Sequence, residues 1–158
     1  MTGLLDSDAF VNNALANAST LNNFLPAIIF LVACAIAFAT GTSRGTYGIL
    51  IPIVLSIFPA GSLVGTIGMS ACLAGAVCGD HCSPISDTTI MSSAGAQCNH
   101  INHVSTQIPY AVTVAAISFV NFAIAPFIAN PWISLVIGVV MTVAVLFVIK
   151  LATNKKAA

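Results

Sequence analysis

The chain alternates long apolar stretches with short polar ones, and charged residues are almost absent from its middle. The residues with a formal charge are Asp6, Asp8, Arg44, Asp80, Asp87, Lys150, Lys155 and Lys156. They leave uncharged runs at 9–43, 45–79 and 88–149. Such runs are typical of membrane-spanning helices, each of which needs about 20 mostly apolar residues. The pattern therefore predicts an all-α integral membrane protein.

Two apolar arms around a polar tip predict a re-entrant helical hairpin at 24–58. The tip is TGTSRGT at 40–46, and the second arm, 47–58, is too short for a complete span. We expect the hairpin to enter and leave the membrane on the same side. Irregular backbone at membrane depth is stable only where protein buries it or where it lines a watery cavity.

A broken transmembrane helix is expected at 62–98. Its first half is rich in glycine and alanine, which let neighbouring helices approach closely. Pro84 lacks a backbone N–H, and its ring disfavours a straight helix through the preceding turn. Beyond this helix the pattern predicts a polar loop at 99–108 and two further transmembrane helices at 109–129 and 132–149.

The two ends of the chain are more polar than the transmembrane domain, which we place at 24–150. Residues 1–23 are too polar to span and suggest an interfacial or polar N-terminal helix. They contain no Lys or Arg and do not resemble a cleavable signal. Three lysines lie at or near the polar tail 151–158, which by the positive-inside rule is expected in the cytoplasm.

Composition narrows the classes of protein further. Hydrophobic residues make up 58% of the chain and charged residues 5%, whereas roughly a quarter of an ordinary soluble domain is charged. The net charge of zero excludes the basic surface that nucleic-acid binding needs. The five cysteines suggest small buried hydrophobes rather than disulfides. Four or five crossings are few for a complete transporter, so we expect part of a larger functional unit.

Asp80 and Asp87 flank the predicted break and are the candidate ion-binding residues. A charged side chain at the centre of a span costs about 2.5–3.5 kcal/mol on insertion scales, so intramembrane acids indicate function. The neighbouring hydroxyls of Ser83, Ser86 and Thr88 add hard oxygen ligands for an alkali cation. A carboxylate in this setting can hold a proton or a sodium ion in turn. The alternative is that Asp87 or Ser86 only caps the second half-helix and Asp80 lies at a membrane surface.

The hairpin tip offers a second group of oxygen ligands. Thr42, Ser43 and Thr46 carry hydroxyls, although the segment also fits a simple glycine-rich turn with Gly41 as a C-cap. Arg44 has three interpretations: it pairs with an acidic residue of the broken helix, binds an anionic substrate, or reaches water.

No complete transition-metal site is evident. Cys78, His81 and Cys82 have helical spacing, and His100 and His103 are three residues apart, but neither set supplies enough ligands. His81 is either a proton relay in a polar cavity or an ordinary packed residue. We expect no cofactor, with Na⁺ and H⁺ as the transported ions.

Two longer strings carry a resemblance to a known family. FATGTSRGTYGILIPI at 38–53 and GDHCSPISDTTIMSSAGAQCNHINHVSTQIPYA at 79–111 resemble the C-terminal part of the NhaC family of bacterial sodium/proton antiporters. The family is similar to the ion-transporter superfamily, whose two inverted repeats each hold a re-entrant hairpin and a broken helix. The resemblance implies that this chain supplies the second half.

The resemblance also implies site residues. It places Thr42, Ser43 and Thr46 at the hairpin tip and assigns to the facing broken helix Asp80, Ser83, Ser86, Asp87 and Thr88. Arg44 departs from the family pattern, which has Trp at this position. A positively charged side chain here favours binding of an anion. The opposing first half is missing from these residues.

These observations predict the C-terminal portion of a Na⁺/H⁺ antiporter of the bacterial inner membrane. Its expected partners are the lipid bilayer and either the missing N-terminal half or further copies of the chain. A carboxylate/cation exchanger with Arg44 holding the anion is one alternative, and a non-transporting remnant that only inserts in the membrane is another. An enzyme is disfavoured because no nucleophile and base are paired in the sequence.

Overall fold

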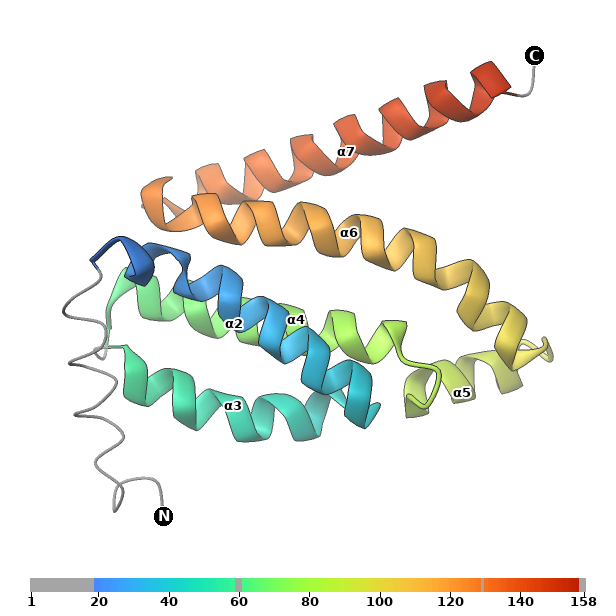
Figure 1. The fold of residues 1–158 in the computed structure, drawn as a ribbon, viewed down its shortest axis with the longest axis horizontal. Coiled ribbons are helices and arrows are strands. Elements are labelled where there is room, and N and C mark those ends of the chain that lie inside the picture. The colour runs from blue at the N-terminus through green and yellow to red at the C-terminus, as the bar shows by residue number, and fades with distance from the viewer. Residues whose placement is uncertain (1–18, 59–60, 129, 157–158) are drawn as a thin grey trace.

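The computed structural model describes residues 19–58, 61–128 and 130–156, and within them all regular structure is helical (Figure 1). The helices are α2 (Ser19–Thr40), α3 (Ser43–Ile57), α4 (Leu63–Cys82), α5 (Asp87–Gly95), α6 (His100–Ile128) and α7 (Pro131–Lys156). The predicted all-α class is confirmed. The predicted interfacial helix falls largely on residues 1–18, outside the described residues, while Ser19–Asn23 form the start of α2.

Four of these helices are long and apolar enough to cross a membrane. The candidate spans are Asn23–Thr40, Leu63–Cys82, His100–Ile128 and Trp132–Leu151, whereas α3 is shorter, with 15 residues. Helix α7 follows α6 and diverges from the other helices toward its C-terminal end (Figure 1). None of its spanning window is buried inside the described structure, so its apolar surface is suited to contact with lipid or with another helix.

Helices α2 and α3 form the predicted hairpin (Figure 1). The turn between them lies at Gly41. Gly41 has φ 67°, a left-handed conformation that glycine adopts readily, and its N–H donates to the carbonyl of Ala37. Thr42 is the N-cap of α3 and accepts a hydrogen bond from the N–H of Gly45. The first arm is longer than predicted and could cross a membrane alone, so re-entry stays a prediction.

Helices α2 and α4 pack closely through small residues. A Cβ atom added at Gly75 or Gly79 would clash with the backbone carbonyl of Phe30 or Cys34, respectively, on α2. These glycines therefore let the two backbones approach closely, as expected where small residues recur at helical spacing. The close approach brings the last turn of α4 against α2, and this turn carries Asp80.

The predicted helix break is confirmed: α4 ends at Cys82 and α5 begins at Asp87. The predicted polar loop at 99–108 is wrong, because α6 begins at His100 and continues through Pro109. Asn99 explains the difference: its Oδ1 accepts hydrogen bonds from the N–H groups of Ile101 (3.0 Å) and Asn102 (3.2 Å) and so starts the helix. Residues 151–156 of the predicted polar tail continue α7, and the cytoplasmic location of the tail stays a prediction.

Candidate functional site

The carboxylate of Asp80 lies at the helix break and is the centre of the candidate site. Asp80 is 3% exposed, and both of its oxygens have hydroxyl partners from the start of α5. The Ser86 hydroxyl donates to Oδ1 over 2.7 Å, and Thr88 Oγ1 lies 3.2 Å from Oδ2. Because the chain turns back at the break, residues six and eight positions later reach a side chain on α4.

A third contact closes these groups into a ring. Ser86 Oγ and Thr88 Oγ1 are 2.7 Å apart, so Asp80, Ser86 and Thr88 make three short oxygen–oxygen contacts. Each contact needs one hydrogen, but the two hydroxyls supply only two. Ser86 donates its hydrogen to Oδ1 and Thr88 donates its hydrogen to Oδ2, so the contact between the two hydroxyl oxygens has no hydrogen of its own. The ring therefore has one hydrogen-bond position that its two hydroxyl groups do not fill.

The backbone N–H groups of the break donate hydrogen bonds to oxygen atoms of residues 80–83. Ser83 is fully buried; its N–H donates to the carbonyl of Asp80 (3.1 Å), and its hydroxyl accepts from the N–H of Ile85 (3.4 Å). The N–H of Ser86 donates to the carbonyl of Ser83 over 3.4 Å. Ser83 thus shapes the break and contributes no hydrogen bond to the Asp80 carboxylate.

Asp87 occupies a different environment from Asp80. It is the first residue of α5 and is exposed, and its side chain forms no hydrogen bond or ion pair within the described part of the chain. An acidic residue in the first turn is favourable for the helix dipole. Ser86 lies at the N-cap position but forms no side-chain capping hydrogen bond, because its hydroxyl donates to the carboxylate of Asp80. Capping therefore does not account for Ser86.

The hairpin tip meets the break at Gly41, although its hydroxyls are bonded locally. Thr46 is buried, donates to the carbonyl of Thr42 (2.8 Å) and lies 3.4 Å from the hydroxyl of Thr40. Ser43 is half-buried, and its hydroxyl has no partner among the described residues. No hydrogen bond joins the tip hydroxyls to Asp80 in the part of the chain that the structure describes.

Arg44 and His81 stand apart from the Asp80 ring. Arg44 is exposed and forms no ion pair with a described carboxylate, so the predicted pairing with an acidic residue is absent. His81 is exposed, and its Nδ1 lies 2.9 Å from the carbonyl of Val77 on its own helix. It lines a cavity of about 850 Å³ between α4 and α6, together with Gln107 and Tyr110. Its role as a proton relay stays a prediction.

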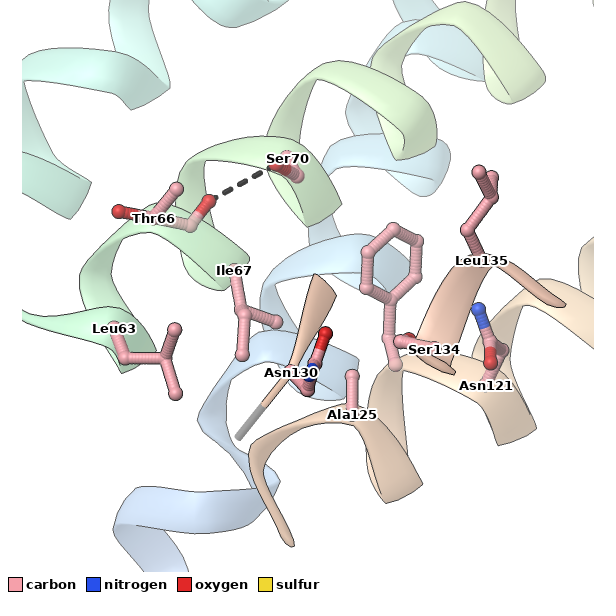
Figure 2. Close-up of a pocket in the computed structure, with 10 residues that line it drawn as sticks. Leu63, Thr66, Ile67, Ser70, Asn121, Ala125, Asn130, Ser134 and Leu135 are labelled. Carbon is pink, nitrogen blue, oxygen red and sulfur yellow. Dashed lines mark hydrogen bonds between the residues drawn. The ribbon is translucent and has the colours of Figure 1, made fainter. Parts of the chain in front are cut away.

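A separate cavity of about 340 Å³ lies where the first turns of α4 face α6 and the start of α7. Figure 2 shows its mixed lining, with Leu63 and Ile67 on one side and Asn121 and Leu135 on the other. Asp80 lines neither of these two cavities, since it is enclosed by the break itself. The candidate site is therefore defined by the buried carboxylate and not by an open pocket.

The contact of His100 with the helix break could not be predicted from the sequence. Its spacing from His103 does not indicate this contact, in which the ring Nε2 lies 2.7 Å from the carbonyl oxygen of Pro84 inside the break. No local pattern signals a contact over 16 positions. Among the described residues, no three His, Cys, Asp or Glu side chains are grouped closely enough to hold a metal ion.

A bundle of apolar helices with a buried carboxylate at a broken helix is the arrangement expected of a secondary transporter. The family model described as the Na⁺/H⁺ antiporter family matches residues 6–127. The chain belongs to this family of membrane transporters.

An uncharacterized protein of Haemophilus influenzae is 43% identical over 139 residues, which cover 87% of this chain and 27% of that protein. The chain thus spans about a quarter of that relative's length. No solved structure matches the chain.

Proposed function

We propose that this chain is the C-terminal portion of an NhaC-like Na⁺/H⁺ antiporter of the bacterial inner membrane, with Asp80 as the exchanging group. The observation that carries the proposal is the buried Asp80 carboxyl group, closed into a ring by the hydroxyls of Ser86 and Thr88. Membership of the Na⁺/H⁺ antiporter family supports the same reading.

The ring provides a direct competition between a proton and a sodium ion. When Asp80 is protonated, the three hydrogens of the ring are shared among its oxygens. When sodium arrives, the carboxyl proton leaves, the Ser86 and Thr88 hydroxyls turn their hydrogens away, and their oxygens face the cation together with the carboxylate. One site cannot hold both ions, so alternating access converts this competition into exchange.

The rest of the proposed assembly follows from the family's architecture. The hydroxyls of Thr42, Ser43 and Thr46 lie at the tip that contacts the break, and we assign them to the wall of the ion path. Asp87 is exposed beside the ring and is suited to attract cations toward it. Since the chain spans about a quarter of its relative, the opposing wall would come from the N-terminal half or from another copy.

Arg44 supports a second candidate, a carboxylate/cation exchanger of the same family. Its guanidinium is exposed at the start of α3 and has no described carboxylate as a partner. It is therefore free to bind an organic anion through paired N–H groups. Exchange that requires both sodium and a carboxylate, and that Arg44→Gln abolishes, would favour this candidate.

The proposal is tested by sodium-triggered collapse of a preset proton gradient in liposomes that contain the chain. We expect Asp80→Asn to abolish the collapse, because an amide cannot release a proton to sodium. Asp87→Asn is the comparison variant: Asp87 has no hydrogen bond to the ring and only attracts cations toward it, so the variant should raise the apparent sodium KM and keep most of the maximal rate. An unchanged rate in Asp80→Asn would contradict the proposal. No collapse by correctly inserted wild type would show that this chain alone is inactive.

A further inference from the structure

His100 connects the start of α6 to the helix break. Its Nε2 lies 2.7 Å from the carbonyl oxygen of Pro84, and its Nδ1 lies 3.0 Å from the hydroxyl of Ser93 on α5. His100 is half-buried and Ser93 is 3% exposed. One imidazole ring therefore bonds both the connection between α4 and α5 and the body of α5.

Counting hydrogens fixes the donor at one of these contacts. The Pro84 carbonyl can only accept, so Nε2 must carry a hydrogen. The Ser93 hydroxyl also lies 2.9 Å from the carbonyl of Ile90. In the neutral ring Ser93 can donate to Nδ1, and in the protonated ring Nδ1–H donates to Ser93, which then bonds Ile90. The Nε2–H bond to Pro84 is present in both forms.

The Pro84 carbonyl is a sensitive point in the break. Pro84 interrupts the helix, so its carbonyl oxygen accepts no helical hydrogen bond. A backbone carbonyl without a helical hydrogen bond needs another donor where water is scarce. The next two residues are Ile85, which contacts the hairpin tip, and Ser86, which donates to Asp80. A rotation of the peptide that follows Pro84 would therefore move the Ser86 hydroxyl away from the carboxyl group.

We propose that His100 is a positioning residue: its Nε2–H holds the Pro84 carbonyl and thereby keeps the Ser86 hydroxyl on Asp80. The expected effect on transport rests on the proposed ion exchange at Asp80. The effect of His100 on the conformation of the break does not depend on that proposal. The bond to Ser93 only anchors the ring. Loss of the Nε2–H bond should weaken the binding of sodium and affect the maximal rate less.

Two amide side chains separate the roles of the two ring nitrogens. Glutamine places an N–H donor the same number of bonds from Cα as Nε2, whereas asparagine matches Nδ1. We expect His100→Gln to keep the apparent sodium KM within about threefold of wild type. We expect His100→Asn and His100→Ala to raise it about tenfold, the effect of one lost hydrogen bond. His103→Gln and His103→Asn are the controls, since His103 forms no side-chain hydrogen bond among the described residues.

Amide hydrogen exchange of residues 84–90 in the same liposomes gives a readout independent of transport. Faster exchange is expected in His100→Asn and His100→Ala and not in His100→Gln. Ser93→Ala removes only the anchor of the ring and leaves the Nε2 bond in place, so its amide exchange should stay closer to that of wild type than the exchange of His100→Ala. Equal behaviour of the Gln and Asn variants would overturn the inference. Wild type without sodium exchange would overturn the proposed function, while amide exchange would still decide the role of His100.

Discussion

Gly41 at the hairpin tip lies against the backbone carbonyl of Ile85 in the helix break. A Cβ atom at position 41 would stand 2.7 Å from the Ile85 carbonyl oxygen, closer than real Cβ contacts allow. Ile85 immediately precedes Ser86, whose hydroxyl is bonded to Asp80. The tip and the candidate ion site are therefore connected through backbone packing and not through the tip hydroxyls.

Replacement of Gly41 by alanine should disrupt this contact. The added methyl group meets the Ile85 carbonyl, and the φ of 67° adds about 1–2 kcal/mol for a residue with a Cβ atom. We expect a loss of about 2 kcal/mol or more in the free energy of unfolding, measured in detergent, together with lower sodium exchange. Gly48→Ala is the control, because nothing lies within 4 Å of a Cβ atom there. Equal loss in both variants would refute the packing argument.

Gly75 should tolerate alanine no better, for a different reason. Its backbone conformation is helical, but an added Cβ atom would clash with the carbonyl of Phe30 and press on the side chain of Ala33. Helices α2 and α4 would have to separate, at a cost of about 1–3 kcal/mol in unfolding free energy. Gly95→Ala at the end of α5 meets nothing within 4 Å and should be neutral or slightly stabilising. A neutral Gly75→Ala would mean that this helix pair is not tightly packed.

The Ser86 hydroxyl should matter more to sodium binding than that of Ser83. Ser86→Ala removes a ring oxygen bonded to Asp80, and the loss of one such ligand should raise the apparent sodium KM about tenfold. Ser83→Ala removes only a local bond to the N–H of Ile85, so its effect should fall on stability. Both variants lose one buried hydroxyl, which makes them a matched pair in the liposome assay. A larger KM change in Ser83→Ala would place the cation elsewhere in the break.

Two substitutions of Thr88 distinguish the contribution of its hydroxyl group from that of its methyl group. Thr88→Ser keeps the oxygen near Asp80 and Ser86, whereas Thr88→Val keeps the shape and removes the oxygen. We expect near-normal exchange in the serine variant and a several-fold higher sodium KM in the valine variant. The reverse order would show that Thr88 contributes packing and not a ligand.

The position of the break could be predicted from the sequence because its causes are local. Pro84 and the two acidic residues mark the break between α4 and α5, and the hairpin turn follows from the Gly41 segment. The different environments of Asp80 and Asp87 could not be predicted, because they depend on where the chain returns after the break. The contacts of Gly41 with Ile85 and of His100 with Pro84 join positions 44 and 16 residues apart, which no local pattern encodes.

The start of α6 is polar in composition and nevertheless helical. Residues 99–108 are polar, yet Asn99 Oδ1 accepts hydrogen bonds from two backbone N–H groups and so caps a helix at this point. Asn99→Ala should lower the free energy of unfolding by about 1 kcal/mol and unwind the first turn of α6, measured by amide exchange of residues 100–104. Asn99→Asp, which keeps a capping oxygen, should restore both values. Because His100 lies in this turn, Asn99→Ala should also speed amide exchange at residues 84–90. Unchanged exchange at residues 84–90 would show that the Asn99 cap is not needed for the hydrogen bond between His100 and Pro84.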